Sequence, residues 1–527
     1  MARRARFRME IVKIAKKWSL RKRKMILDIA FRVLPAITER TVAVGEAFGL
    51  GLDKEQEFPI CKRFELEIGP KDIVYITGPS GSGKSVILRA LKEELASLWT
   101  VADVDDVRIE RGAPIIETLG SDVDEAIRLL SLAGLGDAFV WLRTFDELSD
   151  GQKHRYKLAK LVETGAQIWI ADEFCSTLDR DTARIVAFSL QKIVRRLGKG
   201  LIVATTHTDL FRDLGPTIHI SKGLGDEISV RYYPDELVRC CSLLEEISFC
   251  LAKSASERRE GRALIEKWHY RGRIPPFKRM FIAKRSGAVI GAVLFSPPYA
   301  SCWARRMVFK HLPSLRELNT WVYTASRIVV HPLYRGIGLG SALLKRALMA
   351  SDRPYVELVA VMARYNPFAE RAGMTKVCEK DPDPAVERAI RALKGLGIDT
   401  RLMASERYNL SVLSSMSEAD IEALKEALRP LRLPGVMRAL KEIKGPYPRA
   451  SEWERALDRA GRPEIARVLS ALAEARSKKV YLIWRSPHIP PGACPLDDLL
   501  REEWRGKLLR GVVSDGRAEE DTHPGYR

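Results

Sequence analysis

Alternating apolar and polar segments divide the chain into regions with different periods. Residues 46–235 alternate short apolar runs with stretches of helical period, which is typical of an α/β domain. Residues 255–382 repeat this alternation around a Gly-rich turn of their own, and residues 236–254 are predicted to form a connecting helix. Residues 383–527 are mainly helical in pattern and end in a polar tail. The patterns therefore predict a multidomain α/β protein with a helical C-terminal region.

The last region contains three segments of helical period, Val386–Leu393, Glu418–Leu428 and Val436–Ile443. Val480–Trp484 is a further strand candidate. The acidic, Pro-containing stretch Glu379–Pro384 precedes these segments and predicts a domain boundary after residue 382.

The first region, residues 1–45, is predicted to be a basic arm. Met1–Lys24 holds eleven Lys or Arg and one acid, Glu10, so it carries half of the net charge of +20. Part of it has the spacing of an amphipathic helix that can bind RNA, DNA or an anionic membrane, and a transit peptide or a solvated tail are the other interpretations. A local basic block favours a polyanionic partner, and we expect nucleic acid. The apolar positions of this helix are Ile11, Ile14, Ala15 and Trp18.

The remaining composition bears on membranes and redox state. No run of 18 or more apolar residues occurs, so no membrane-spanning segment is predicted. The eight cysteines form no C-x-x-C pair, and no signal peptide precedes them. We therefore expect reduced thiols and a cytoplasmic protein.

A nucleotide site is predicted in residues 46–235. Ile73–Ile76 reads as a buried strand that runs into the motif G-x-x-x-x-G-K-S, after which a helix begins. The glycines let the backbone wrap phosphates, and the helix N-terminus adds positive potential. Lys84 is predicted to reach the β- and γ-phosphates of ATP, and Ser85 to bind Mg²⁺. The motif consists of Gly78, Pro79, Ser80, Gly81, Ser82, Gly83, Lys84 and Ser85.

A second apolar run, Ile168–Ala171, reads as a strand that ends in two acids. Asp172 suits the Mg²⁺ shell, and Glu173 is placed to polarise the attacking water as a general base. Two acids after a strand are a weak signal alone, but they are a strong one downstream of a P-loop. These residues predict ATP hydrolysis with Mg²⁺.

Three further motifs follow in the order that is found in ABC-type ATPases. Leu148–Gln152 (L-S-D-G-Q) resembles the ABC signature, Ser176–Asp179 resembles the D-loop, and His207 resembles the switch histidine. The chain is therefore identified by resemblance as a soluble ABC-type ATPase with no transmembrane partner of its own. The resemblance implies that the signature of one subunit contacts ATP held by the other, in an ATP-dependent homodimer. It assigns nucleotide contacts to Ser149, Gly151, Gln152 and Asp179, and a catalytic role to His207.

Two features depart from the transporter ATPases. The Q-loop Gln of the family is missing, and Glu117 is the candidate for its place. The interval from Ser85 to Leu148 is short, so the subdomain that docks on a membrane partner is predicted to be trimmed. Both departures favour the branch of the family that acts on nucleic acids or ribosomes.

A second cofactor site is predicted around a Gly-rich turn. Ser326–Val330 reads as a strand, and the turn R-G-I-G-L-G leads from it into a helix, Ser341–Ala350, whose N-terminal N–H groups can hold a pyrophosphate. Together with the later segment Asn366–Met374, this turn resembles the acetyl-CoA loop of GNAT acetyltransferases. Met280–Lys284 and Ala288–Phe295 resemble the opening hairpin of that family. The resemblance assigns acetyl-CoA contacts to Ile328, Val330, Arg335, Gly336, Ile337, Gly338, Leu339, Gly340, Ser341 and Asn366.

The sequence defines the catalytic groups of the transferase less well. The general-acid Tyr of the family falls at Ala369, and Tyr365 is the candidate substitute. A general base must take a proton from the attacking amine. Glu317, Glu357 and His331 are the candidates, and none of them is preferred.

Three main functions are compatible with these features, and modification of a DNA base is a further alternative. The first is ATP-coupled acetylation of an amine on RNA, tRNA above all, because of the basic arm and a loose analogy with tRNA-cytidine acetyltransferases, which also join an ATPase to a GNAT domain. The second is ATP-gated acetylation of a protein amine. The third is an ABC ATPase acting on DNA or ribosomes whose GNAT domain senses acetyl-CoA without catalysis, which the missing Tyr favours.

Overall fold

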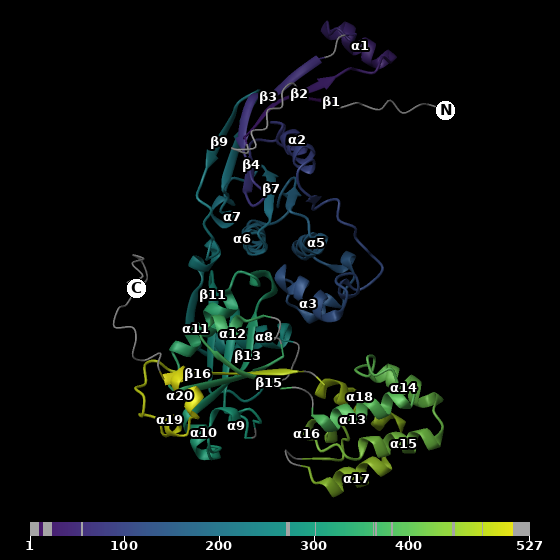
Figure 1. Ribbon diagram of the computed structural model, residues 1–527, viewed down its shortest axis with the longest axis vertical. Helices are drawn as coiled ribbons and strands as arrows, with labels where there is room; N and C mark the ends of the chain where they lie inside the picture. The colour runs from purple at the N-terminus through teal and green to yellow at the C-terminus, as the bar shows by residue number, and fades with distance from the viewer. Residues whose placement is uncertain are drawn as a thin grey trace. The chain divides into compact units, whose positions relative to one another are not determined.

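The chain folds into two compact units in the computed structural model (Figure 1). One unit consists of Met1–Leu294 with Arg327–Ala347, and the other of Phe295–Ser326 with Leu348–Arg527. The structure describes residues 10–13, 24–53, 56–269, 274–300, 302–361, 363, 366–380, 383–444, 448–476 and 478–509. No helix among these residues is long and apolar enough to cross a membrane.

The first unit begins with a three-stranded antiparallel sheet of order β1-β2-β3. The second strand alternates in burial, because Met25, Leu27 and Ile29 point into the core. The helix expected around Ile11 is wrong in part, since the β-branched pair Ile11 and Val12 extends this sheet as a strand. Residues 14–23 of that prediction lie outside the described residues. The elements are β1 (Glu10–Lys13), β2 (Lys24–Val33), α1 (Glu39–Phe48) and β3 (Gln56–Glu67).

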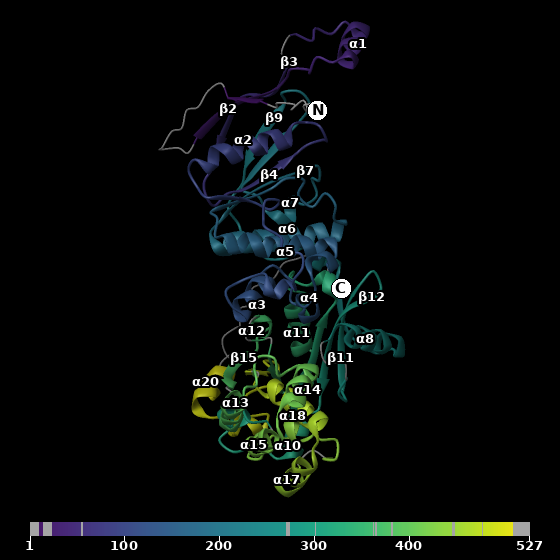
Figure 2. The same ribbon diagram turned by 90° about the vertical axis from the view of Figure 1, so that its right-hand side faces the viewer.

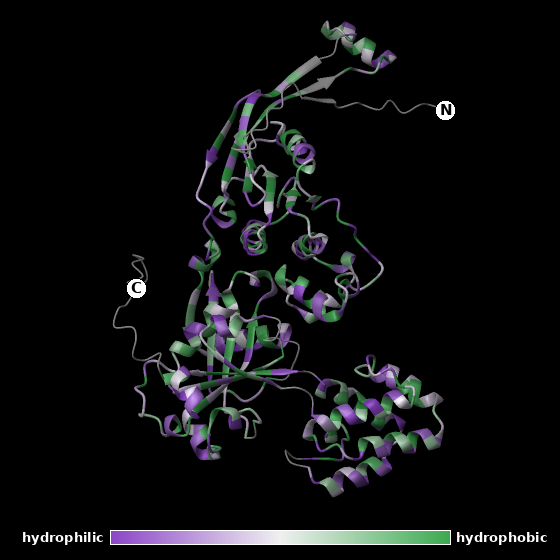
Figure 3. Ribbon diagram, viewed as in Figure 1, coloured by the Kyte–Doolittle hydropathy of each residue, from purple (hydrophilic) through white to green (hydrophobic). Residues whose placement is uncertain are grey.

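A six-stranded sheet follows, with order β5-β6-β7-β4-β8-β9 and every strand parallel to its neighbour except the last, antiparallel one. Its strands are β4 (Ile73–Thr77), β5 (Val101–Asp103), β6 (Ile168–Ala171), β7 (Gly200–Thr205), β8 (Ile218–Lys222) and β9 (Ile228–Tyr232). The central strands β4 and β7 are buried at every residue and are mostly green in Figure 3, as expected for strands covered on both faces.

Helices cover this sheet, and two of them, α5 and α6, pack side by side in Figures 1 and 2. The α-helices are α2 (Lys84–Ala96), α3 (Val123–Leu132), α4 (Ala138–Trp141), α5 (Asp150–Thr164), α6 (Arg180–Leu197) and α7 (Phe211–Leu214). Short 3-10 turns are η1 (Ile115–Glu117) and η2 (Phe145–Glu147). The arrangement confirms the P-loop ATPase fold that the motifs predict, with the P-loop between β4 and α2.

The third sheet has seven strands in the order β10-β11-β12-β13-β14-β16-β15. Its strands are β10 (Ser248–Leu251), β11 (Arg279–Arg285), β12 (Ala288–Ser296), β13 (Val322–Val330), β14 (Tyr355–Ala360), β15 (Thr375–Lys380) and β16 (Lys479–Arg485). The predicted hairpin is confirmed, because Ser286 and Gly287 turn between β11 and β12 with φ of 49° and 83°. Strands β13 and β14 run parallel.

Helices and turns around these strands complete the domain. They are η3 (Ser242–Glu246), α8 (Ala255–Trp268), α9 (Arg305–Val308), α10 (Leu315–Trp321), η4 (Pro332–Tyr334), α11 (Leu339–Met349), α12 (Phe368–Arg371), α19 (Pro495–Asp498) and α20 (Glu502–Leu509).

Two sequence expectations about this domain are corrected. The connecting helix over 236–254 is absent from the structure, which has the turn η3 and the strand β10 there. Phe249 and Leu251 alternate with the exposed Ser248 and Cys250, and this period of two suits a strand paired with β11. Likewise the domain does not end at residue 382, because β16 returns between β14 and β15 and is antiparallel to both.

The predicted C-terminal helices therefore form an insertion between β15 and β16, with an apolar core of their own (Figure 1). The expected helices over 386–393 and 418–428 are confirmed, whereas the one from Val436 ends already at Met437. The insertion comprises α13 (Pro384–Gly395), α14 (Glu406–Ser415), α15 (Glu418–Leu428), α16 (Pro434–Met437), α17 (Ala450–Arg459) and α18 (Arg462–Ala475).

Candidate nucleotide and acetyl-CoA sites

The P-loop has a backbone that only glycine can adopt at two points. Gly78 follows β4 with φ of 157°, and a Cβ there would overlap the carbonyl oxygen of Lys222. Gly83 begins α2 with φ of 96°, and a Cβ there would lie 2.8 Å from the side chain of Ile60. The loop therefore keeps a concave backbone at a helix N-terminus, where anions bind.

Two side chains of the loop, Lys84 and Ser82, have polar groups that could bind a phosphate. The ammonium of Lys84 donates to the carbonyl of Pro79 at 2.7 Å, so it folds back over the loop. Burial lowers the pKa of Lys84, and the charges of Asp172 and Glu173 oppose that shift. The hydroxyl of Ser82 is buried and has no hydrogen-bond partner among the described residues. A phosphate group would satisfy both, so the residues fit ATP.

The two acids lie directly after β6, as the sequence predicts. The backbone N–H of Glu173 donates to Asp172 Oδ1 at 2.9 Å. Glu173 has a φ of 44°, a left-handed conformation that is costly for a residue with a Cβ and clusters at functional sites. The described residues hold no group of three or more His, Cys, Asp or Glu placed as a metal site. Mg²⁺ needs only one or two protein ligands beside phosphates and water, so a pair such as Ser85 and Asp172 would fit it.

The switch-histidine candidate lies in the loop after β7. The hydroxyl of Tyr75 on β4 donates to the carbonyl of His207, and the N–H of His207 donates to Thr205 Oγ1 at 3.2 Å. Burial and the positive charge of Arg180 lower the pKa of His207. The neutral ring is therefore favoured, and its N–H could donate a hydrogen bond to a phosphate oxygen.

The signature and the D-loop both lie at helix N-termini. Ser149 is the N-cap of α5, and its N–H donates to Gln152 Oε1 at 3.0 Å in a capping box. Asp179 is the N-cap of α6 and accepts from the N–H of Thr182 at 3.0 Å. A Cβ on Gly151 would lie 2.8 Å from the methyl of Thr182, so the glycine permits close packing of the two helices.

His154 on α5 makes the stability of this region depend on pH. Its ring contacts Phe174, its Nε2 is enclosed without a partner among the described residues, and burial lowers its pKa from 6.5 to about 4. The unfolded chain therefore binds more protons than the folded one between about pH 6.5 and about pH 4, and stability falls as pH falls through that window.

We expect His154→Phe to reduce this acid sensitivity. The native protein should lose up to about 1.4 kcal/mol for each pH unit below about 6.5 through this group. Thermal unfolding of both proteins between pH 7.5 and pH 5 measures the difference. Parallel melting-temperature curves would show that His154 makes no such contribution.

The Gly-rich turn between η4 and α11 has the predicted geometry for an anion. Gly336 and Gly338 have φ of 93° and 91°, and a Cβ on Gly338 would meet nothing within 4 Å. Helix α11 begins at Leu339, so its first N–H groups lack partners within the helix. Gly336 and Gly338 are exposed, so the turn fits the pyrophosphate of acetyl-CoA.

The same turn contacts the ATPase domain within the first unit. Arg335 donates to Val330 O at 3.0 Å and pairs with Asp137 at 2.8 Å, so its guanidinium is engaged away from any phosphate. Arg155 of the signature helix α5 donates to Leu333 O at 3.2 Å. Burial and the nearby charge of Arg335 lower the pKa of Arg155 to about 10. The acetyl-CoA role of the Arg335 side chain stays a prediction.

Two of the predicted base candidates have structural partners. Glu357 on β14 is buried and accepts from Arg305 at 2.7 Å, from Thr324 at 2.8 Å and from Tyr481 at 3.1 Å. Glu317 accepts from the N–H of Ser314 at the start of α10, and the bonds from Ser314 lower its pKa. These bonds occupy both carboxylates, so neither enters the proposed mechanism.

The remaining transferase candidates are distributed as follows. His331 Nδ1 accepts from Leu333 N at 3.3 Å, and burial lowers the pKa of His331, so its ring is neutral. Asn366 is exposed just before α12, and Ala369 is fully buried in that helix. Tyr365 lies outside the described residues. The structure therefore leaves the general acid open.

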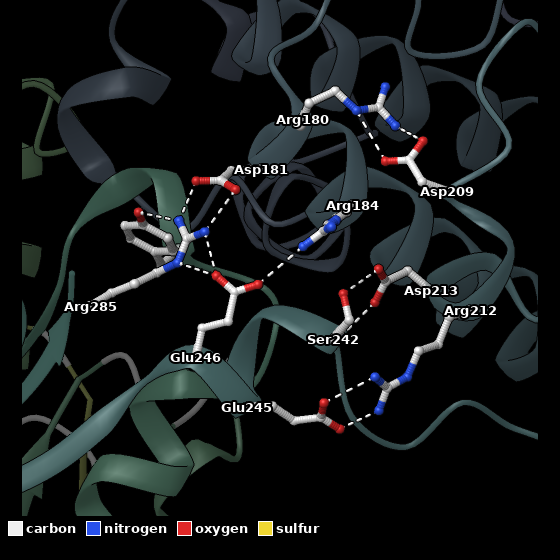
Figure 4. A network of polar contacts seen from close by, with 11 residues as sticks. Arg180, Asp181, Arg184, Asp209, Arg212, Asp213, Ser242, Glu245, Glu246 and Arg285 are labelled. Atoms are coloured by element: carbon white, nitrogen blue, oxygen red, sulfur yellow. Dashed lines mark hydrogen bonds and ion pairs between the residues drawn. The ribbon is translucent and has the colours of Figure 1, made fainter.

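Sequence reasoning missed the contacts that join the two sites, because they arise only from tertiary packing. Arg285 at the hairpin turn pairs with Asp181 and Glu246 (Figure 4). No motif contains these residues, and a charged hairpin turn ordinarily indicates solvent exposure. The fold and sites together define a P-loop ATPase that is joined to an acetyl-CoA-binding type of domain.

Comparisons with known proteins agree with this class. The family model "Acetyltransferase (GNAT) family" matches residues 241–372. The cytochrome c biogenesis ATP-binding export protein CcmA of Paracoccus denitrificans is 31% identical over 164 residues, which are 28% of this chain and 74% of that protein. The methionine import ATP-binding protein MetN 1 of Lactiplantibacillus plantarum is 27% identical over 198 residues, 31% of this chain. The chain spans 55% of the length of that relative.

A solved bacterial ABC transporter cassette, described as a dimer, is 20% identical, with a TM-score of 0.29 over 34% of this chain and 94% of the cassette. The chain belongs to the ABC-type ATPases through its first domain, and it carries a GNAT-family acetyltransferase domain.

Proposed function

We propose that the protein hydrolyses ATP and transfers acetyl groups from acetyl-CoA to an amine of a nucleic acid, RNA above all. The observation that carries the proposal is one compact unit that contains both the P-loop and the Gly-rich turn before α11. The cofactors are then ATP, Mg²⁺ and acetyl-CoA, and the protein acts in the cytoplasm.

In the ATPase domain, the P-loop amides and Lys84 would hold the phosphates. Ser85 and Asp172 would hold Mg²⁺, which supplies charge neutralisation at the phosphates when bound. Glu173 would accept a proton from the attacking water, and neutral His207 would hydrogen-bond the γ-phosphate. Exposed Ser149 and half-buried Gly151 would complete the site of a second copy, so the ABC domain would be an ATP-driven dimerising switch.

In the acetyltransferase domain, the N-terminal N–H groups of α11 and the turn around Gly338 would bind the pyrophosphate. The backbone of the strand that contains Ile328 and Val330 would polarise the acetyl carbonyl. The amine nitrogen would then attack the carbonyl carbon and the C–S bond would break. His331 or water would take the amine proton, and Tyr365 or water would donate a proton to the leaving thiolate.

The basic arm is the support for a nucleic-acid partner. Met1–Lys24 has a net charge of +10 by count, eleven cations less one acid. Such a segment binds phosphates without reading sequence, and its affinity falls with salt because counterions are released. The arm would therefore hold the acceptor RNA while the transferase domain selects the amine.

The test is an acetylation assay with labelled acetyl-CoA and, in turn, total tRNA, rRNA, DNA and a protein extract, with and without ATP. We expect label in RNA, and more of it with ATP. Label in protein alone would replace RNA by a protein amine as the acceptor.

Neutralising the arm should weaken RNA binding. The variant changes four residues that precede β1 to Gln: Arg3, Arg4, Arg6 and Arg8. A plot of log K for RNA association against log salt concentration should become less steep by about 0.7 for each phosphate that the arm no longer neutralises. A matched variant neutralises four exposed cations of the insertion. An equal weakening in both variants would contradict a specific role of the arm. The control positions are Arg388, Arg391, Lys394 and Arg407.

One observation favours a second candidate function. Ala369, fully buried in α12, stands where the GNAT family usually has its general-acid Tyr. A domain that binds acetyl-CoA without transferring its acetyl group would make the protein an acetyl-CoA sensor on an ABC ATPase. Absence of label from every acceptor, together with measurable acetyl-CoA binding, would promote this candidate.

A further inference from the structure

The acetyl-CoA turn is tied to the two helices that carry the nucleotide-sensing motifs. Helix α6 begins at the D-loop residue Asp179, and Asp181 lies in its first turn. Arg285, at the β11–β12 turn, donates two hydrogen bonds to the Asp181 carboxylate, one of them at 3.0 Å (Figure 4). Arg285 also donates to Tyr334 Oη at 3.1 Å, and Tyr334 directly precedes the Gly-rich turn.

Neighbouring charges hold Arg285 in this geometry. Glu246 accepts from Arg285 Nη2 at 2.6 Å and from Arg184 of α6 at 3.1 Å, so it bridges two arginines. The Arg285 side chain is mostly enclosed, with 15% of its surface accessible. A partly desolvated fork of this kind is more directional than a surface pair, because both of its planar edges are used.

A second tether comes from the signature helix. Arg155 on α5 is buried and donates to the carbonyls of Gly134 at 3.4 Å and Leu333 at 3.2 Å. Arg335 pairs with Asp137, the N-cap of α4, at 2.8 Å. Helix α5 therefore hydrogen-bonds the segment before the turn directly, and α6 is linked to Tyr334 through Arg285.

We propose that Arg285 is a positioning residue for the acetyl-CoA turn, and that it makes acetyl-CoA affinity depend on the nucleotide state of the ATPase. The proposal rests on the proposed function. When ATP draws the D-loop toward a partner subunit, the first turn of α6 moves Asp181, and Arg285 passes that displacement to Tyr334 and the turn. Linkage requires the reverse effect as well, so acetyl-CoA must change ATP affinity by the same factor.

The test measures the affinities for ATP and for acetyl-CoA by calorimetry. It uses the full chain with Glu173→Gln, because this variant should bind ATP without hydrolysing it during the measurement. We expect saturating ATP to change the Kd of acetyl-CoA by about 5- to 150-fold, and acetyl-CoA to change the Kd of ATP equally. Arg285→Gln should bring both ratios closer to 1, leaving only the part carried by the second tether, while each ligand alone still binds. Arg285→Lys, which keeps the charge but loses the fork, should restore part of the ratio.

Two further variants distinguish a loss of coupling from a general disturbance of the structure. Tyr334→Phe removes only the hydroxyl that accepts from Arg285, and it should lower the coupling ratio without unfolding the domain. Lys157 lies on α5, as Arg155 does, and forms an ion pair with Asp105 at 2.7 Å inside the ATPase domain. Lys157→Gln removes this pair and should leave the ratio unchanged.

Three results would overturn the inference. Coupling that persists in full in Arg285→Gln, or a parent chain that binds both ligands independently, would remove Arg285 as the link while leaving the proposed function intact. A parent chain that does not bind acetyl-CoA at all would instead reject the proposed function, and the inference with it.

Discussion

Replacing Glu173 with Gln should lower ATP hydrolysis by about 10²- to 10⁴-fold, the usual contribution of a general base. The amide keeps the size and the left-handed backbone of the residue, whose φ is 44°, but it cannot take a proton. Lys84, Ser82 and the loop amides are untouched, so ATP should bind with nearly unchanged affinity. Phosphate release under single-turnover conditions and calorimetry with ATP measure the two effects separately.

The control for this variant is Glu110→Gln, which removes an exposed carboxylate of the same domain. It should hydrolyse ATP at the native rate. With ATP and Glu173→Gln, light scattering should also show a dimer, because a trapped nucleotide holds the signature of a second copy. Native hydrolysis by Glu173→Gln would show that another group activates the water.

The sequence predicted most of the local ATPase geometry, because its motifs are continuous stretches with fixed conformations. The run Ile73–Ile76, the glycines after it and the helix from Lys84 require only local backbone rules. The two acids after β6 were placed for the same reason. The N-cap roles of Ser149 and Asp179 could also have been read from the sequence, since a small polar residue precedes each helical segment.

Long-range strand pairing explains the parts that could not be predicted. The strand β16 follows the helical insertion, and nothing in Lys479–Arg485 says that it lies between β14 and β15. Ser248–Leu251 lies within a segment that was predicted to be a helix, and a four-residue alternation is too short to decide between helix and strand. The pairing with β11 decides between the two.

The candidate transferase base shows a different limit. Glu357 looked available in the sequence, yet a buried partner, Arg305, holds it across 52 residues of chain. Breaking a buried ion pair destabilises the folded protein, because it leaves one charge buried without a partner. A carboxylate in such a pair is therefore better suited to a structural role than to proton transfer. The choice between a catalytic and a structural acid therefore depends on a partner that the sequence does not indicate.

Replacing Gly338 with Glu should abolish measurable binding of acetyl-CoA. Gly338 has a φ of 91°, where a side chain costs about 1–2 kcal/mol, and it directly precedes the N-terminus of α11. The new carboxylate would repel a pyrophosphate bound at this turn, and a separation of about 4 Å is taken for the estimate. Repulsion there is on the order of 4 kcal/mol near a protein surface, which is about a 1,000-fold loss of affinity.

A glycine with the same backbone provides the matched control for this loss. Gly397, after α13 in the helical insertion, has a φ of 80°, and a Cβ there meets nothing within 4 Å. Gly397→Glu introduces the same side chain with the same strain, but beside no anion site, so acetyl-CoA should bind as in the native protein. Gly338→Ala should lie between the two, because it adds strain without charge. Calorimetry on the three variants separates charge from strain, and native affinity in Gly338→Glu would place the pyrophosphate elsewhere.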